Sequence, residues 1–341
     1  MTTWNGAGLL RQSIDSVLAQ TMPAFELVVV DDASTDATAA ILAGIGDARL
    51  RVLRSASNLG VVAARNFGFA ACDAPLVAML DHDDLCAPDR LAQQVARLDA
   101  EPALVAVGSG QYNLHDDGSR RGTDHPAVTS PLLLRWMLHV DNPLAWSSLM
   151  LRRGAVLRLG AFVRPAYEYA DDFDLLHRLL QIGEIGRIDA PLVTYRFHAN
   201  NTSRHRAAAM TDHAANLLGE VYRPWFGDDA AAAAARLVIR HLCDRQPVTD
   251  GATLAQLGTV MQRLLDCFCA AHAADADTAA PVHAHAAATW WRVVRAATRS
   301  GRPWLVTQYA GLAGLRRGFR PAASDIAVSL GIGAARALLR R

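Results

Sequence analysis

The sequence lacks the features by which several classes of protein are recognised. It contains no uninterrupted apolar run of about 18 residues, so we expect no membrane-spanning helix. No apolar segment of the kind found in secretory signal peptides follows Met1. The five cysteines are an odd number, and none is spaced as CxxC, the spacing typical of zinc and redox sites. We therefore expect a cytoplasmic protein with reduced thiols.

Lysine is absent as well, and the 34 basic residues, all arginines, are unevenly distributed. The net charge of the 341 residues is only +1, but ten arginines and one acidic residue lie between Trp290 and Arg341. That end of the chain therefore carries about +9 and the rest about −8. Hydrophobic residues make up 51% of the chain, which excludes disorder as its main state, and the length indicates about two domains.

Short apolar runs alternate with helical patterns from the N-terminus to about residue 200. The expected strands are 25–30, 50–53, 76–80 and 104–107, and the expected helices are 8–19, 37–43, 61–71 and 88–98. This alternation predicts an α/β fold with a mostly parallel central sheet covered by helices on both faces. After about residue 204, strand signals stop and alanine-rich helical stretches follow. We therefore expect two domains, 1–204 and 205–341, the second entirely helical.

Acidic side chains stand where predicted elements end or begin. Asp31 and Asp32 follow one strand, residues 81–84 follow another, and residues 171–174 open a helix. In an open parallel sheet, ligands bind outside the carboxyl ends of the strands. Asp81 and Asp83 would place two hard oxygen ligands on one turn, which suits Mg²⁺ or Mn²⁺. Helix capping explains any one such group, but three of them in one domain favour a ligand site.

A series of short segments follows one another in a specific order along the chain: TWN (3–5), SVLAQT (16–21), VVVDDASTD (28–36), NLG (58–60), ARNFG (64–68), DHDD (81–84), PDRL (88–91), residues 147–153, GAF (160–162), DDFDL (171–175) and YRFH (195–198). In this order they resemble glycosyltransferase family 2, whose members are inverting enzymes of the A-type nucleotide-sugar-binding fold. Each segment alone is a weak motif, and their shared order is the specific signal. The resemblance does not cover the chain beyond about residue 205.

The resemblance implies a role for individual positions in binding a nucleoside-diphosphate sugar. The residues that would bind this donor are Thr3, Asn5, Asp31, Asp32, Arg65 and Asp81. Thr3, Asn5 and either Asp31 or Asp32 would line the pocket for base and ribose. Arg65 would approach the nucleotide, and Asp81 would form the family's DxD motif together with Asp83.

The resemblance also implies the reaction. Asp83 would ligate a divalent ion, Mn²⁺ or Mg²⁺, and His198 matches a histidine that in relatives reaches the metal or the diphosphate. The ion would neutralise the departing nucleoside diphosphate, while Asp172, at the position of the catalytic base, would take the acceptor's proton. We expect a metal-dependent inverting transfer to a hydroxyl of a glycan or lipid-linked acceptor, in the synthesis of bacterial cell-envelope polysaccharide.

Two positions depart from the family pattern. Ala33 replaces the usual glycine of the Asp-Asp-Gly-Ser turn, so we expect the turn to differ slightly, because alanine lacks glycine's freedom for positive φ. Relatives also carry an apolar strand directly before the segment at residues 3–5, whereas only Met1 and Thr2 precede it here. The first strand therefore looks missing, and we expect the biological chain to start upstream of Met1.

The basic C-terminal end also carries aromatic residues. They are Trp290, Trp291, Trp304, Tyr309 and Phe319. Arginines interleaved with such side chains suit an anionic membrane surface, so peripheral contact with the inner face of the membrane is one interpretation. The other is a basic appendage that docks on the acidic domain or joins two copies. Nucleic-acid binding is not expected, since no motif for it is present.

Three other functions fit the sequence less well than glycosyl transfer. A sugar-phosphate nucleotidyltransferase would need a glycine-rich phosphate loop with a basic residue, and residues 5–8 (NGAG) do not supply one. A dinucleotide-binding oxidoreductase is excluded because no GxGxxG follows a strand. A catalytically inactive binding or scaffold protein stays open: the start of the chain favours it, and the acidic residues Asp81, Asp83 and Asp172 speak against it.

Overall fold

The computed structural model describes residues 1–123, 125–128, 130–199, 201–272, 275–309, 311–312 and 314–339. The chain divides into two compact units. The first comprises Met1–Leu134 and Pro143–His213, and the second comprises Arg135–Asn142 and Ala214–Arg341. The short segment Arg135–Asn142 thus groups with helices that follow it by some 70 residues or more in the sequence, which no local pattern indicates.

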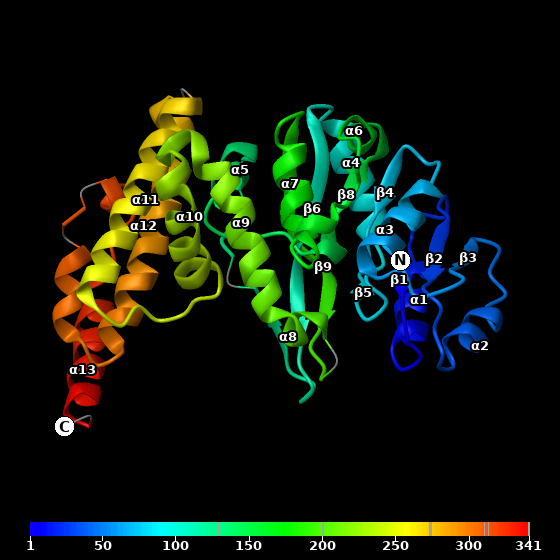
Figure 1. Ribbon diagram of the computed structural model, residues 1–341, viewed down its shortest axis with the longest axis horizontal. Coiled ribbons are helices and arrows are strands. Elements are labelled where there is room, and N and C mark those ends of the chain that lie inside the picture. The colour runs from blue at the N-terminus through cyan, green and yellow to red at the C-terminus, as the bar shows by residue number, and fades with distance from the viewer. Residues whose placement is uncertain are drawn as a thin grey trace. The chain divides into compact units, whose positions relative to one another are not determined.

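The first unit contains two β-sheets (Figure 1). Three parallel strands form the smaller sheet in the order β1-β2-β3, namely β1 (Thr2–Thr3), β2 (Leu27–Asp31) and β3 (Leu50–Arg54). The larger sheet has the order β4-β8-β6-β9-β5, and β7 pairs with β6. Its strands are β4 (Leu76–Ala78), β5 (Leu85–Cys86), β6 (Leu104–Leu114), β7 (Arg120–Gly122), β8 (Met150–Arg152) and β9 (Glu184–Arg196).

The larger sheet is mixed. Its long central strands β6 and β9 run parallel and side by side (Figure 1), whereas β8 is antiparallel to both β4 and β6. β5 is likewise antiparallel to β9. The expected α/β fold class is confirmed, with parallel pairing in the smaller sheet and between the two longest strands of the larger one.

Helices cover the sheets because their apolar side chains recur at helical spacing. In α1 (Leu10–Leu18), the side chains of Leu10, Ile14 and Val17 are buried against Leu27 and Val29 of β2. All five residues of β2 are buried, as its unbroken run of valines predicts for a strand covered on both faces. The other helices of this unit are α2 (Thr38–Ala43), α3 (Val61–Ala70), α4 (Arg90–Ala100), α6 (Arg153–Arg158), α7 (Asp171–Leu179) and α8 (Thr202–His205), with short 3₁₀ turns at Trp146–Ser148 and Pro165–Tyr167.

Ala33 holds the left-handed conformation that its turn requires, with φ of 57°. That conformation costs an alanine roughly 1–2 kcal/mol, while glycine pays about 0.5–1 kcal/mol more than alanine in conformational entropy on folding. We therefore expect Ala33→Gly to raise the free energy of unfolding by about 0.5–1 kcal/mol, the difference between these two effects. Urea denaturation measures it, and a glycine variant less stable than the parent would show that the turn carries no such strain.

The second unit is helical, as expected from the sequence. Its elements are the end of α5 (Pro131–Met137), most of α9 (Ala207–Phe226), α10 (Asp228–Val238), a π-helical turn at Ile239–Cys243, α11 (Gly251–His272), α12 (Ala276–Arg299), 3₁₀ turns at Pro303–Tyr309 and Gly314–Arg316, and α13 (Ala323–Leu338). In its core, Phe268 packs edge-on against Trp136, with ring centroids 5.4 Å apart. The hydroxyl of Tyr222 donates a hydrogen bond to the carbonyl of His139. These two contacts explain why the segment from Arg135 belongs to this unit.

Two of the tryptophans near the C-terminal end are core residues. Trp290 and Trp291 are fully buried in α12, and the Trp291 indole donates to Asp325 at 2.9 Å. Asp325 also binds Arg299 at 2.8 Å and Arg295 at 3.5 Å. Part of this basic, aromatic segment therefore holds α13 to α12, whereas its third tryptophan, Trp304, is 62% exposed. Within the described residues, every helix is either too short or too polar to cross a membrane.

Candidate functional site

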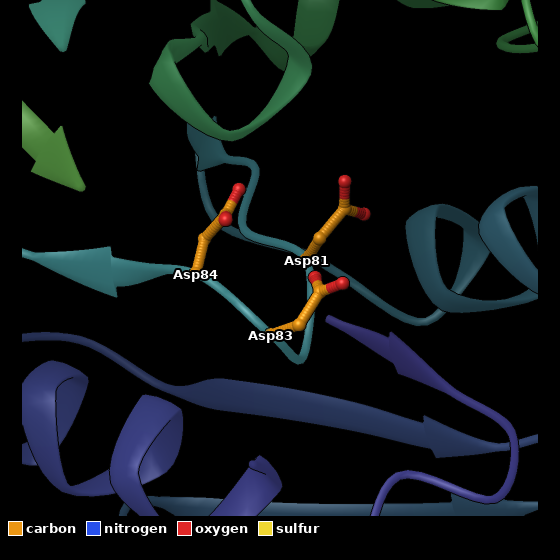
Figure 2. A group of neighbouring side chains, drawn as sticks. All are labelled: Asp81, Asp83 and Asp84. Atoms are coloured by element: carbon orange, nitrogen blue, oxygen red, sulfur yellow. The ribbon is translucent and has the colours of Figure 1, made fainter. Parts of the chain in front are cut away.

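The acidic turn after β4 brings three carboxyl groups together. Asp81, Asp83 and Asp84 each place one carboxylate oxygen within 4.8 Å of the others, and their side chains point to the same side of the turn (Figure 2). The backbone amide of Asp81 donates to the Ser147 hydroxyl at 3.0 Å, which fixes the start of the turn. A cluster of this kind offers several hard oxygen ligands to one cation.

The electrostatics of the cluster favour a bound cation. Asp84 is 1% exposed, and burial followed by the charges of Asp83 and Asp81 raises its pKa well above the usual range. Burial also raises the pKa of Asp81, although the charge of Arg65 opposes the shift. The Oδ2 atom of Asp84 is buried without a hydrogen-bond partner among the described residues. The donor set therefore fits a divalent ion such as Mn²⁺ or Mg²⁺, which would relieve the repulsion and satisfy this oxygen.

His198 reaches the same cluster from the segment that follows β9. Its Nε2 atom lies 3.0 Å from Oδ2 of Asp83, so the two residues predicted as metal ligands are neighbours. Asp84 is tied to the end of the same strand, because its Oδ1 accepts a hydrogen bond from the backbone amide of Arg196 at 3.1 Å. The sequence pattern does not single out Asp84 as a ligand, and its place directly after Asp83 is the available signal.

Arg65 links the metal-binding turn to the start of α7. Its guanidinium donates to Asp81 at 3.0 Å and also binds the carboxylate of Asp171. It lies over the Trp146 ring, with its central carbon 3.8 Å from the ring centroid, and its side chain is 11% exposed. Because Asp81 and Asp171 are 90 positions apart, no local pattern indicated this link or the contribution of Trp146.

Asp172 stands in the first turn of α7, beside Asp171. Desolvation and then the charge of Asp171 raise the pKa of Asp172 to about 7, while the Phe173 amide and Arg65 pull it down. The helix is anchored through Asp174, which is fully buried and binds Arg164 and Arg178. A carboxyl group with a pKa near neutrality on a fixed helix suits a general base.

The residues predicted for the nucleotide pocket are the last residues of β1 and β2 or follow these strands closely, and two of them have polar atoms without a hydrogen-bond partner among the described residues. Oδ1 of Asp31 accepts the Ser34 amide at 2.9 Å, while its Oδ2 is buried without a hydrogen-bond partner among the described residues. The hydroxyl of Thr3 is likewise buried without a hydrogen-bond partner among the described residues. Arg54 approaches Oδ2 of Asp31 to 3.6 Å. Asp31 and Thr3 are therefore the groups most ready to receive a ligand.

The other two predicted pocket residues bind neighbouring backbone. Asp32 accepts the amides of Leu59 at 2.9 Å and Gly60 at 3.0 Å, which holds the loop before α3. Asn5 accepts the Thr35 amide at 2.9 Å through its side-chain oxygen and has a left-handed φ of 51°. These contacts fix the walls of the region around Thr3 and Asp31.

Comparisons with known proteins agree with this geometry. Residues 1–160 match the family described as glycosyl transferase family 2. The chain is 42% identical over 107 residues to the succinoglycan biosynthesis protein ExoO of Rhizobium meliloti, a stretch covering 31% of each protein. It is 25% identical to an uncharacterized glycosyltransferase of Haemophilus influenzae over 59% of this chain and 65% of that one. The chain thus spans less than two thirds of the length of these curated relatives.

A solved structure has the same fold. The mannosyltransferase PcManGT from Pyrobaculum calidifontis, in complex with GDP-Man and Mn²⁺, superposes with a TM-score of 0.52 and 21% identity. The match covers 96% of this chain and 85% of the other. At this identity the likeness establishes the A-type fold alone and does not identify the ligands of this chain.

Proposed function

This chain belongs to glycosyltransferase family 2 through residues 1–160, and on that premise we propose that it moves a sugar from a nucleoside-diphosphate sugar to a hydroxyl group. The transfer inverts the anomeric carbon and depends on a divalent metal ion. The observation that carries the proposal is the group of Asp81, Asp83 and Asp84, with His198 against Asp83 and one buried carboxylate oxygen left without a partner.

The acidic turn would hold the ion and the diphosphate. When bound, a divalent ion neutralises the charge that develops on the departing nucleoside diphosphate. Asp83 and Asp84 would be its direct ligands, with His198 orienting Asp83. Arg65 holds Asp81 in place and adds a positive charge next to the site.

Asp172 would take the proton of the attacking acceptor hydroxyl. Its raised pKa makes it a stronger base than an ordinary aspartate, and such a base contributes about 100- to 10,000-fold in rate. The neighbouring carboxylates are engaged, Asp171 by Arg65 and Asp174 by Arg164 and Arg178. This supports a single displacement with inversion, since a double displacement needs a second carboxylate as nucleophile.

In the donor pocket, Oδ2 of Asp31 would accept an N–H of the base, and the Thr3 hydroxyl would bind the nucleotide as well. Both atoms are buried and lack a hydrogen-bond partner among the described residues, with Arg54 3.6 Å from Oδ2 of Asp31, so a ligand would satisfy them. Asn5 and Asp32 would shape the pocket through their backbone contacts. Arg65, which lies on α3, would approach the nucleotide.

Release of nucleoside diphosphate tests the proposal without knowledge of the acceptor. The protein is incubated with Mn²⁺ and a panel of UDP-, GDP- and TDP-sugars, because water can replace the acceptor hydroxyl slowly. We expect release from one donor class, abolished by EDTA, with the freed sugar first detected by NMR as the inverted anomer. A retained anomer would overturn the inverting mechanism. Absence of release from every donor, with bacterial membranes added as a source of acceptors, would favour a binding or scaffold protein.

We further propose that the acceptor is a glycan or lipid-linked sugar in polysaccharide assembly, and that the protein contacts the membrane peripherally. ExoO is named for succinoglycan biosynthesis, which supports the setting. The C-terminal end exposes Trp304, Leu338 and Leu339 among its arginines, the last two 71% and 87% exposed. Exposed apolar side chains beside positive charge suit an anionic lipid surface.

A triple variant, Trp304→Ser with Leu338→Ser and Leu339→Ser, is expected to lose most of its sedimentation with vesicles containing phosphatidylglycerol. The apolar anchors are removed while every arginine is kept, so remaining binding would be purely electrostatic and sensitive to salt. Leu157→Ser is the matched control, because Leu157 is 54% exposed in the first unit. Equal sedimentation of all three proteins, or none by the parent, would favour the docked appendage or oligomer contact.

A further inference from the structure

Tyr169, in the loop before α7, holds a backbone conformation that aromatic residues rarely adopt. Its φ is 67°, in the left-handed region. A bulky side chain is strained there, whereas glycine takes the same conformation freely. Strain of this kind persists only where the surrounding structure enforces it, and it is concentrated at active sites. Tyr169 stands three residues before Asp172, so its strain lies next to the proposed base.

Contacts on both sides of Tyr169 enforce its conformation. The amide of Ala170 donates to the carbonyl of Tyr167 at 2.9 Å, which closes the turn around Tyr169. On the other side, Nδ1 of His213 donates to the carbonyl of Glu168 at 2.6 Å. His213 lies in the part of α9 that belongs to the first unit. The backbone that carries the Tyr169 ring is therefore fixed both by its own turn and by a helix.

The stability of the fold does not explain a tyrosine at this position. The side chain of Tyr169 is only half-buried, so its packing returns little of what the backbone conformation costs. Its ring contacts the guanidinium of Arg206, whose central carbon lies 5.8 Å from the ring centroid. Such a contact is weak where it is exposed, and Arg206 is exposed. Arg206 forms no ion pair with any residue that the structure describes, so its charge is available to a ligand.

The contact between Tyr169 and Arg206 joins the two segments that carry the proposed chemistry. Arg206 ends the short helix α8, which follows His198 and its contact with Asp83. Tyr169 precedes Asp172, and three residues of chain span at most about 11 Å. In the proposed transfer, the acceptor oxygen bonds to the anomeric carbon, its proton passes to Asp172, and the electron pair of the broken bond leaves with the nucleoside diphosphate. A molecule whose hydroxyl reaches Asp172 therefore has Tyr169 and Arg206 close to the rest of its body.

We propose that Tyr169 and Arg206 form a platform that binds the sugar ring of the acceptor, an inference that rests on the proposed transfer. The negative face of an aromatic ring attracts the weakly positive C–H groups on the apolar side of a sugar. The guanidinium of Arg206 donates to hydroxyl or carboxylate oxygens at the edge of the same sugar. Because the strained backbone already holds the aromatic ring in place, little freedom is lost when the acceptor binds.

The platform determines which part of the acceptor the protein recognises. A lipid alcohol or glycerol offers a hydroxyl but no rigid ring with an apolar side and a polar edge. Such a molecule gains nothing from the Tyr169 ring, and its hydroxyl is not directed toward Asp172. The protein therefore recognises the sugar of its acceptor, whether that sugar stands free, in a glycan or on a lipid.

Methyl glycosides of glucose, galactose, mannose and N-acetylglucosamine are the probes, and glycerol is the control without a ring. Each is added to the full chain with Mn²⁺ and UDP-, GDP- or TDP-sugars, and release of nucleoside diphosphate is followed. We expect at least one glycoside to accelerate release about tenfold over water, and glycerol to add little. Tyr169→Gly is expected to lose about tenfold in kcat/KM for that glycoside, roughly the value of one aromatic stacking contact, whereas Tyr169→Phe keeps the ring and most of the rate.

The glycine variant also separates binding from folding. Because glycine adopts a φ of 67° without strain, we expect Tyr169→Gly to unfold at a Tm equal to or above that of the parent. A ring that served only the fold would give the opposite result, a lower Tm with kcat/KM for the glycoside unchanged. That result would overturn the proposal.

NMR saturation transfer from the protein to the C–H protons of the glycoside measures binding without turnover, in the presence of Mn²⁺ and UDP or GDP. We expect saturation in the parent and in Tyr169→Phe, and the loss of most of it in Tyr169→Gly. Saturation without any donor turnover in the parent would support the platform and contradict the proposed transfer. Equal saturation in Tyr169→Gly, no saturation of any glycoside in the parent, or donor turnover that no glycoside accelerates would overturn the platform and leave the proposed transfer standing.

Discussion

Replacing Asp172 by asparagine is expected to slow sugar transfer by about 100- to 10,000-fold while the donor still binds. Asparagine keeps the size and polarity of the side chain but cannot accept the acceptor's proton at neutral pH. Transfer is measured as nucleoside diphosphate release in the presence of acceptor, and donor affinity by calorimetry. Asp15→Asn is the matched control, because Asp15 is an exposed aspartate paired with Arg11 on α1. A variant that transfers at the parental rate would exclude Asp172 as the base.

The pKa of Asp172 adds a pH signature to this result. With a pKa raised to about 7, the carboxyl group is mostly protonated below neutrality. We expect kcat/KM to rise about tenfold per pH unit up to about pH 7 and to level off above it. Between the ordinary aspartate pKa of 3.8 and about 7, the folded state holds this proton more tightly than the unfolded state, so the stability contributed by Asp172 falls as pH rises. Asp172→Asn should remove that fall, which urea denaturation at pH 5 and pH 7.5 measures.

Asp83→Ala is expected to reduce metal-dependent donor turnover by about 100- to 1,000-fold, the loss typical when a group that stabilises developing charge is removed. The carboxylate is a direct oxygen ligand in the proposed site, and without it Asp81 and Asp84 cannot complete the coordination. His198→Gln is expected to lose less, about 10- to 100-fold in metal affinity, since it acts by orienting Asp83.

Titration of donor turnover with Mn²⁺ separates these two variants. The His198 variant should reach a near-parental rate at high Mn²⁺, whereas the Asp83 variant should stay slow at every concentration. Parental turnover by Asp83→Ala, or turnover in the parent that EDTA leaves unchanged, would contradict the metal site. Circular dichroism of each variant shows that the fold is retained.

Much of the first unit could be predicted because its signals are local. The valine run of β2 and the spacing of Leu10, Ile14 and Val17 determine a strand and its covering helix over short stretches of sequence. The acidic residues at strand ends were predictable for the same reason. The mixed pairing of the larger sheet was not, since β8 and β4 come from segments more than 70 positions apart and no periodicity records their direction.

The sequence names the residues proposed for the site but not the contacts between them. Asp83 and His198 were both expected, and their contact at 3.0 Å follows only from the pairing of β5 with β9. Arg65 was expected near the nucleotide, but its binding to Asp81 and Asp171 depends on three separate segments meeting. Asp32 could not be distinguished from Asp31 by sequence, because the amides of Leu59 and Gly60 that occupy it lie nearly 30 positions away.

Thermal unfolding with nucleotides tests the central claim most directly, that the acidic turn and the Asp31 pocket form one metal-dependent nucleotide-sugar site. The protein is heated with UDP, GDP, TDP or CMP, each with and without Mn²⁺, beside the Asp83→Ala variant. A ligand at about 100 times its Kd adds roughly 2.7 kcal/mol to the stability of the folded state. We predict such a gain with one nucleoside diphosphate, only when Mn²⁺ is present and only in the parent. Unchanged Tm with every nucleotide in the presence of Mn²⁺, or an equal gain in Asp83→Ala, would contradict the account.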